Sequence, residues 1–282
     1  MKSMPTHYRL LAIDVDGTLV NSSDDLTPAT LAALRRTTAA GIHVVLATGR
    51  RYSHTLHLVE PLGISVPLVT ASGALVKDPA DHRTLYKTEF EATLLRDMLA
   101  TLDGAGYDAL LNADTFDEGF DFFQPREPRR NHYLAEYLAL NPGCGRVWPE
   151  FFASPPPGIF AGFVMGTREE MLAVERLLHA SLPAQITTHV LRSPRYRGFM
   201  CELIPAGVTK WSAVRRLASQ WGIADGEICA VGDDVNDIPM IRSAGLGVAM
   251  GNAVPEVKAA ADRIAPTHDN DGLAEVVSWL FE

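Results

Sequence analysis

The fold of this chain is indicated first by residues 8–18, YRLLAIDVDGT. The run from Tyr8 to Val15 is short and almost wholly apolar, which is typical of a buried strand in a parallel sheet. It ends in aspartates, and ligands of open parallel sheets bind beyond the carboxyl ends of the strands. Gly17 permits a sharp turn of the backbone at that end. Taken alone, the pair of aspartates fits an ordinary turn with solvated acids better than a catalytic site.

Helix and strand patterns alternate after this first strand. Thr27 is predicted to be the N-cap of a helix that ends at Gly41. Apolar runs at Ile42–Ala47 and Val66–Thr70 predict two further strands, with a helix over Leu56–Leu62 between them. The order β, α, β, α, β predicts a parallel sheet with helices on both faces.

The pattern changes between residues 84 and 205. Helices and strands are expected there at a longer spacing: helices over Ala92–Ala105, Arg130–Leu140 and Glu169–Ser181, and strands over Tyr107–Asn112, Ile159–Gly166, Ile186–Leu191 and Phe199–Ile204. After it the first pattern resumes, with helices at Thr209–Trp221, Asp237–Ala244, Pro255–Ala261 and Gly272–Leu280, and strands at Ile228–Val231, Leu246–Met250 and Arg263–Ala265. The prediction is an α/β fold: a doubly wound parallel-sheet (Rossmann-like) core domain of residues 1–83 and 206–282, with an inserted α/β domain of residues 84–205.

Composition excludes several classes of function. The 282 residues carry a formal net charge of −9, which disfavours nucleic acid and anionic membrane as partners. Three scattered cysteines, without CxxC spacing, predict neither a zinc site nor a disulfide framework. Residues 1–10 lack the apolar segment of a signal peptide, and no apolar stretch reaches the length of a membrane span. We expect a cytoplasmic protein, monomeric or weakly dimeric, that neither binds nucleic acid nor enters a membrane.

Two other strand ends carry chemically capable residues. Thr48 and Gly49 offer a hydroxyl and backbone amides that suit an anion, although a capped turn explains this pair as well. The run Gly232-Asp-Asp-Val-Asn-Asp237 places three carboxylates and an amide within a few residues. Like charges this close raise one another's pKa unless a cation compensates, and Mg²⁺ is the usual hard cation with oxygen ligands. Asp237 alone would also suit a helix N-cap.

A resemblance joins these pieces. In this order, DVDGT (14–18), ATGR (47–50), Lys210 and GDDVND (232–237) resemble the four motifs of the haloacid dehalogenase-like superfamily. The long insertion resembles the α/β cap of its Cof-type phosphatases, and GVAMGNA (247–253) is also similar to that subfamily. Two positions depart from the pattern. Ser72 stands where that subfamily usually has asparagine, and Asp234 stands where a small or polar residue is common.

The resemblance implies a Mg²⁺-dependent phosphatase that works through a phospho-aspartate. Asp14 would be the nucleophile and Asp16 the general acid and base. Mg²⁺ would be held by Asp14, Asp233 and the backbone carbonyl of Asp16, with Asp237 orienting metal-bound water. The residues implied in phosphate binding are Thr48, Lys210 and Asn236. For Arg50, a structural ion pair is the better interpretation and a phosphate contact the other.

The substrate would be a small phosphorylated metabolite, such as a sugar phosphate. The insertion would act as a lid that supplies specificity. Its candidate contacts are Arg126, Arg129, Arg130, His132, Arg192, Arg195, Tyr196 and Arg197, while its phenylalanines at 116, 120, 122 and 123 are better explained as core or a dimer contact. Two alternatives stay open: a phosphotransferase such as a phosphohexomutase, and a non-catalytic phosphate-binding protein. The intact Asp14 and Asp16 argue against the second.

Overall fold

A computed structural model describes residues 7–63, 66–125, 131–192 and 195–282. The chain forms two compact units. The first, here called the core unit, combines Met1–Tyr86 with Thr209–Glu282, and the second, the inserted unit, is Lys87–Val208. No helix within the described ranges is long and apolar enough to cross a membrane.

The core unit is built on one eight-stranded sheet. Its order is β14-β13-β12-β1-β2-β3-β4-β5. The strands are β1 (Leu10–Ile13), β2 (His43–Ala47), β3 (Leu68–Thr70), β4 (Leu75–Lys77), β5 (Thr84–Lys87), β12 (Ile228–Gly232), β13 (Leu246–Ala249) and β14 (Arg263–Ile264). All neighbours from β14 to β3 pair in parallel, whereas β4 runs antiparallel to β3. The central strand, β1, is fully buried, as its apolar sequence predicts.

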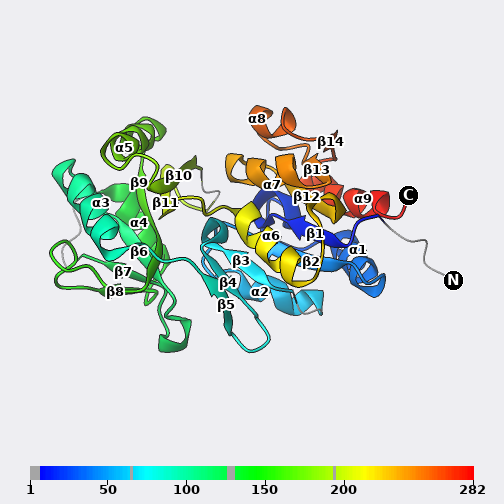
Figure 1. Ribbon diagram of the computed structural model, residues 1–282, viewed down its shortest axis with the longest axis horizontal. Coiled ribbons are helices and arrows are strands. Elements are labelled where there is room, and N and C mark those ends of the chain that lie inside the picture. The colour runs from blue at the N-terminus through cyan, green and yellow to red at the C-terminus, as the bar shows by residue number, and fades with distance from the viewer. Residues whose placement is uncertain (1–6, 64–65, 126–130, 193–194) are drawn as a thin grey trace. The chain divides into compact units, whose positions relative to one another are not determined.

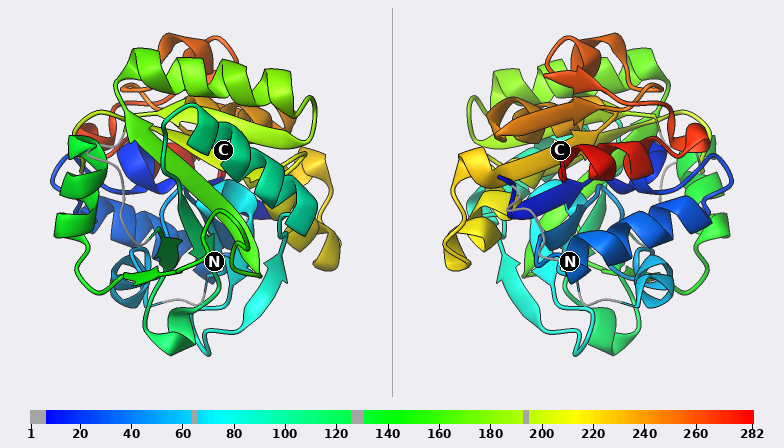
Figure 2. Two further views of the ribbon diagram at one scale, coloured as in Figure 1. Left: turned by 90° about the vertical axis from the view of Figure 1, so that its left-hand side faces the viewer. Right: turned by 90° about the vertical axis from the view of Figure 1, so that its right-hand side faces the viewer.

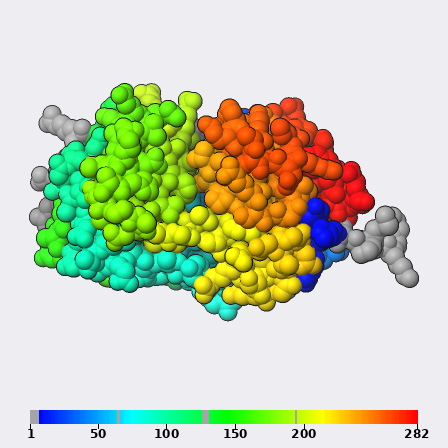
Figure 3. Space-filling model, turned by 45° about the horizontal axis from the view of Figure 1, so that its top comes forward, coloured from blue at the N-terminus to red at the C-terminus, as the bar shows by residue number. Residues whose placement is uncertain are grey.

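Helices cover both faces of this sheet (Figures 1 and 2). On one face, α1 (Pro28–Ala39) lies beside α9 (Gly272–Trp279). The helices of the other face are α6 (Lys210–Gln220), α7 (Ile238–Ser243) and α8 (Pro255–Lys258). Leu10 and Ala12 of β1 share a core with these helices, so alternation sends the intervening side chains to the first face. In Figure 3, α6 and the segments after β12 form much of this unit's visible surface.

Local sequence explains two helix ends in the core unit. The Thr27 side chain accepts a hydrogen bond from the backbone amide of Thr30, so the predicted N-cap of α1 is confirmed. The helix expected over Leu56–Leu62 instead consists of α2 (Leu56–Val59) and a 3₁₀ turn over Glu60–Leu62. Pro61 lies in that turn, and its missing amide hydrogen removes the bond that an α-helix would need there.

The inserted unit holds a six-stranded sheet of order β10-β11-β9-β6-β7-β8. Its strands are β6 (Leu110–Ala113), β7 (Phe122–Gln124), β8 (Gly145–Val147), β9 (Ile159–Gly166), β10 (Ile186–Leu191) and β11 (Phe199–Pro205). All its pairs are antiparallel except β7 with β8. Its helices α3 (Ala92–Gly104) and α5 (Arg168–Ser181) pack against each other.

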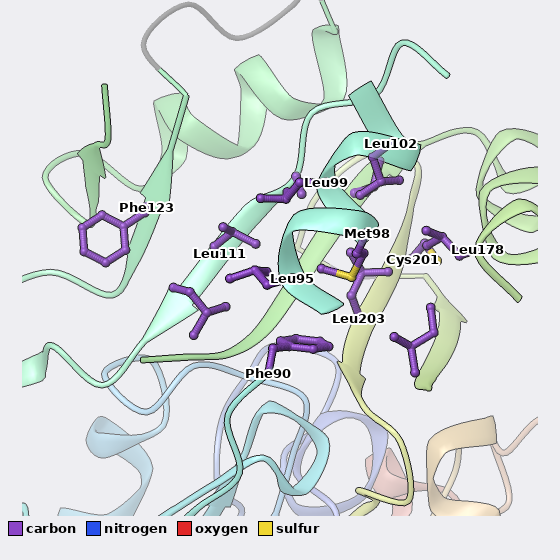
Figure 4. Close-up of a cluster of buried hydrophobic side chains, with 14 of the residues drawn as sticks. Phe90, Leu95, Met98, Leu99, Leu102, Leu111, Phe123, Leu178, Cys201 and Leu203 are labelled. Carbon is purple, nitrogen blue, oxygen red and sulfur yellow. The ribbon is translucent and has the colours of Figure 1, made fainter. Parts of the chain in front are cut away.

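Two clusters of apolar side chains form the core of the inserted unit. In Figure 4, Met98 and Leu99 of α3 lie over strand residues such as Leu203. Phe120 and Phe123 belong to this cluster. Phe122 belongs to the second cluster, beside α4 (His132–Leu140). For these three phenylalanines the interpretation as core is therefore confirmed.

The prediction of elements was wrong in some places. The short strands β4, β5, β7 and β8 were not predicted as strands. The strand expected over Tyr107–Asn112 begins at Leu110, and the helix expected from Arg130 begins, within the described residues, at His132. Along the chain, the compact units divide after Tyr86 and before Thr209, and the predicted division lies after residue 83 and before residue 206.

Candidate active site

The motif residues gather at one edge of the core sheet. Asp14 follows β1, Thr48 follows β2 and Asp233 follows β12. The three strands are parallel neighbours, and Ile13 of β1 is in register with Val231 and Leu46. Their carboxyl ends therefore coincide, which is where ligands bind in sheets of this kind.

Lys210 joins two buried carboxylates at the centre of this edge. Its Nζ lies 2.6 Å from Oδ1 of Asp14 and 2.7 Å from Oδ1 of Asp237. The lysine side chain is 2% exposed and that of Asp237 is fully buried. Thr209, which caps α6, fixes Lys210 as the first residue of that helix. Lys210 is therefore a buried lysine that pairs with two carboxylates at once.

Burial dominates the electrostatics of this cluster. Burial first, and then repulsion by Asp237, raise the pKa of Asp14 to about 8 in spite of Lys210. Burial, followed by repulsion from Asp14 and Asp237, raises the pKa of Asp233 to about 9. Burial works against the charge of Lys210, but the two carboxylates outweigh it and raise its pKa. The cluster thus holds more negative charge than one lysine compensates.

Asp237 supports the loop after β12. Its Oδ2 accepts hydrogen bonds from the backbone amides of Asp233 (3.0 Å) and Asp234 (3.1 Å). The Asp234 carboxylate accepts a bond from the Val235 amide. Within the described residues Asp237 makes no side-chain bond to the first turn of α7. Asp237 thus takes the N-cap position of α7, as the sequence allowed, but its side chain turns back toward the loop instead of capping the helix.

Asn252 connects two motif loops. No function was predicted for it from the sequence. Its Nδ2 donates to the Gly17 carbonyl (2.8 Å) and to Oδ2 of Asp233 (3.2 Å). The amide of His268 donates to its Oδ1 at 3.0 Å. Gly17 has a φ of +75°, and a Cβ there would lie 2.2 Å from Asp233 Oδ2. A larger residue at Gly17 would therefore displace Asp233. The GNA pattern was the only sequence signal for Asn252.

Thr48, Ser72 and Asn236 lie close together on the same side. Thr48 is fully buried, and its Oγ1 accepts a bond from the Arg50 amide at 3.0 Å. The Ser72 amide donates to the Thr48 carbonyl (3.0 Å), and Asn236 Nδ2 donates to Ser72 Oγ (3.3 Å). Ser72 has a φ of +50°, a conformation that asparagine adopts more readily than serine. The departure at Ser72 thus lies inside the site and contacts a predicted phosphate-binding residue.

Arg50 forms an ion pair with the predicted general acid and base. Its Nε and one terminal nitrogen lie 2.9 and 2.8 Å from the two carboxylate oxygens of Asp16. The same guanidinium contacts Asp24. Burial works against the charge of Arg50, but its bonds to Asp16 and Asp24 raise its pKa. The ion pair expected of Arg50 is therefore present, with Asp16 and Asp24 as its partners.

Three carboxylates of the cluster could hold a metal ion. Ligand atoms of Asp14, Asp233 and Asp237 lie within 4.8 Å of one another. Oδ2 of Asp14 is buried and has no hydrogen-bond partner among the residues that the structure describes. Asp237, in contrast, uses both oxygens, one for Lys210 and one for backbone amides. The arrangement fits a hard cation with Asp14 and Asp233 as carboxylate ligands and Asp237 as their support.

The candidate contacts of the inserted unit are less informative. Arg126, Arg129 and Arg130 lie outside the described residues. The Tyr196 hydroxyl pairs with Asn141, and Arg197 Nε lies 3.6 Å from Glu136. Both contacts join residues of the inserted unit to each other.

Comparison with known proteins identifies the family. A model of the haloacid dehalogenase-like hydrolases matches residues 11–277. The chain belongs to this family. It is 31% identical to phosphatase YwpJ of Bacillus subtilis (strain 168), across 97% of this chain and 100% of that protein. It is also 31% identical to the HMP-PP phosphatase of Serratia proteamaculans (strain 568), across 89% and 86% of the two chains.

Solved structures agree with the fold of this haloacid dehalogenase-like hydrolase. A haloacid dehalogenase-like hydrolase from Bacteroides thetaiotaomicron matches with a TM-score of 0.79 and 26% identity, over 97% of this chain and 100% of that one. The predicted superfamily, the doubly wound α/β fold class and the predicted enzyme class, a haloacid dehalogenase-like phosphatase, are therefore confirmed.

Proposed function

We propose that this phosphatase hydrolyses a phosphomonoester of a small metabolite through a phospho-aspartate on Asp14, with Mg²⁺ as cofactor. The observation that carries the proposal is the state of the Asp14 carboxylate. Lys210 holds its Oδ1, whereas Oδ2 is buried and, in the described part of the chain, meets no hydrogen-bond partner. A carboxylate oxygen that is fixed and otherwise unengaged suits both nucleophilic attack and metal ligation.

The chain's own residues account for both halves of the reaction. An oxygen of Asp14 attacks phosphorus, the bond from phosphorus to the substrate oxygen breaks, and Asp16 gives that oxygen a proton. Asp16 then takes a proton from water, which attacks the phosphorus and releases phosphate and the Asp14 carboxylate. Thr48, Asn236 and Lys210 would position the phosphoryl group and offset its charge.

The donor set described above supports the metal proposal. Asp14 and Asp233 would hold Mg²⁺ together with the backbone carbonyl of Asp16. When bound, Mg²⁺ would offset the charge of the phosphoryl group and of the carboxylates around it. Phosphate release from p-nitrophenyl phosphate, measured with Mg²⁺ and after exhaustive chelation, tests this directly. Full turnover in the chelated sample would contradict it.

The substrate class is proposed from chemistry and from relatives. The Serratia proteamaculans relative is named as a phosphatase of one compound, HMP-PP. An acidic protein with a net charge of −9 is a poor partner for nucleic acid, which favours small substrates. A panel of phosphorylated metabolites, scored for released phosphate, would identify the substrate. Conversion of a sugar phosphate to its isomer, without release of phosphate, would favour the phosphohexomutase alternative.

The inserted unit is proposed as the cap that selects the substrate. The support comes from the order of the chain: Lys87–Val208 forms a compact unit of its own, and in the sequence it lies between the two segments of the core unit. Two chain crossings form a natural hinge. X-ray scattering with and without a phosphate analogue tests whether this unit moves. Identical profiles, together with a single angle in crystals of both states, would remove the support for a lid.

A further inference from the structure

Two acidic side chains, Asp16 and Asp24, share the guanidinium of Arg50. Arg50 donates to both oxygens of Asp16, a bidentate contact that fixes the direction of the carboxylate as well as its place. The arginine side chain is only 7% exposed, whereas those of Asp16 and Asp24 are 32% and 30% exposed. The guanidinium is therefore buried between two partly exposed carboxylates.

Asp24 anchors the other side of this guanidinium. One terminal nitrogen of Arg50 is shared between Asp16 and Asp24, and the other lies 3.5 Å from Oδ2 of Asp24. Asp24 also lies 4.0 Å from Nε2 of His57, which is half exposed. Removal of the Asp24 charge would leave Arg50 without its second carboxylate and free to tilt.

A specific turn presents Asp24 to Arg50. The Asn21 side chain accepts bonds from the amides of Ser23 (2.9 Å) and Asp25 (3.0 Å). The Asp24 amide donates to the Asn21 carbonyl, and Asp24 itself has a φ of +65°. A residue other than glycine rarely takes this conformation. The loop after the first motif is thus folded so that its acid reaches the arginine of the second motif.

We propose that Asp24 is a positioning residue for Asp16. By fixing Arg50, it keeps the Asp16 carboxylate in the direction from which a proton reaches the leaving oxygen. This inference rests on the proposed function, in which Asp16 is the general acid and base. It concerns a residue outside the four motifs, and it assigns Arg50 to the proton-transfer group rather than to the phosphate.

The test compares substrates that need the proton with one that does not. Asp24→Asn keeps the size of the side chain and removes its charge, and Asp25→Asn makes the same change one residue away. Asp25 is exposed, and within the described residues its hydrogen bonds are all made by its backbone. Each variant is assayed with an alkyl phosphate, such as a sugar phosphate, and with p-nitrophenyl phosphate, whose leaving group departs without protonation. Asp16→Asn serves as the reference for loss of the acid.

For Asp24→Asn we expect kcat to fall about 10-fold or more on the alkyl phosphate and less than about 3-fold on the aryl phosphate, since general acid–base catalysis contributes about 10²–10⁴-fold. KM should change much less, and Asp25→Asn should behave as the parent. Arg50→Lys, which keeps the charge but loses the fork, should show the same selectivity between substrates. The increase in Tm with Mg²⁺ should persist in Asp24→Asn, because the metal ligands are untouched.

Two results would overturn this inference alone, and a third would overturn the proposed role of Asp16 together with it. Equal losses on both substrates would make Asp24 a structural residue only, and faster turnover of the alkyl phosphate would mean that Arg50 restrains Asp16 instead of positioning it. If Asp16→Asn itself showed no preference between the leaving groups, the assignment of Asp16 as acid would be wrong, and with it the positioning role of Asp24.

Discussion

Lys210 is the residue on which the buried cluster depends. It lies between the carboxylates of Asp14 and Asp237, and all three side chains are nearly or wholly inaccessible. Loss of one partner from a buried ion pair leaves an uncompensated charge and costs about 3–5 kcal/mol. Lys210→Met should therefore lower the free energy of unfolding by about this amount and abolish turnover. Urea unfolding followed by circular dichroism measures the first effect.

A double variant separates charge from packing in this prediction. In Lys210→Met with Asp237→Asn, one of the two orphaned charges is also removed, so part of the lost stability should return. If the double variant lost as much free energy of unfolding as the two single variants together, the lysine would contribute by packing rather than by pairing.

Asn252 should tune the metal site without taking part in the chemistry. It bonds both to Asp233 and to the carbonyl of Gly17, so it fixes a proposed ligand against the nucleophile loop. Residues that orient metal ligands typically contribute about 10–100-fold to metal affinity. We expect Asn252→Ala to weaken Mg²⁺ binding by about this factor, measured by titration calorimetry on the metal-free protein. An unchanged dissociation constant would show that Asp233 is fixed by the backbone alone.

At the scale of elements, α5 offers a test that is confined to the inserted unit. Thr167 accepts from the Glu170 amide (3.2 Å), and Glu170 Oε2 accepts from the Thr167 amide (2.7 Å), which forms a complete capping box. Loss of such a cap costs about 1 kcal/mol. Thr167→Ala should destabilise the protein by this amount in urea and leave the chemistry of the core unit intact.

Thr101→Ala is the matched control for this change. Thr101 lies within α3, and its hydroxyl donates to the carbonyl of Asp97, four residues back. The same replacement there should cost little, because alanine favours helix interiors. Equal losses for Thr101→Ala and Thr167→Ala would contradict the capping account.

Most elements of the core sheet could be predicted because its inner parallel strands are nearly continuous apolar runs. β4 was missed because it has only three residues and ends in Lys77, which is buried and donates to Thr84 Oγ1. With a charged residue among only three, the sequence of this segment does not indicate that the strand is buried. The alternation of helix and strand in the insertion was clear, whereas β7 and β8 are too short to show a period.

The candidate site was predicted to the extent that its residues are neighbours in sequence. Asp233 and Asp237 fall within one motif at a strand end, so their proximity needs no knowledge of the fold. The contact of Asn252 with Gly17 spans 235 positions, and that of Asp24 with Arg50 depends on a left-handed turn. No periodicity reports such contacts, because they arise only when the strands pair and the loops close.

At the scale of the whole molecule, pH and metal should be coupled. The pKa of Asp14 is raised to about 8 and that of Asp233 to about 9, by burial and then by repulsion among the carboxylates. The pKa of an aspartate in an unfolded chain is about 4, so the folded chain binds these protons more tightly. The stability that they confer is complete below about pH 4 and is lost as the pH rises through the folded pKa values.

Mg²⁺ should reverse this loss, because metal ligands bind deprotonated. The increase in Tm on adding Mg²⁺ should therefore grow as the pH rises from about 6 to about 9, as measured by scanning calorimetry at fixed ionic strength. In Asp233→Asn most of this growth should disappear, whereas Asp25→Asn should retain it. An increase in Tm that is the same at both ends of the range would argue against proton release from the cluster.

The central claim is that phosphate passes through Asp14, and a trapped analogue of that state tests it most directly. Beryllium trifluoride with Mg²⁺ mimics a phosphorylated carboxylate, and a crystal structure of the complex would place the beryllium. The account predicts beryllium on an Asp14 oxygen in the parent and no adduct in Asp14→Asn, which should also lack turnover. An adduct on Asp16 or Asp233, or substantial turnover by Asp14→Asn, would contradict it.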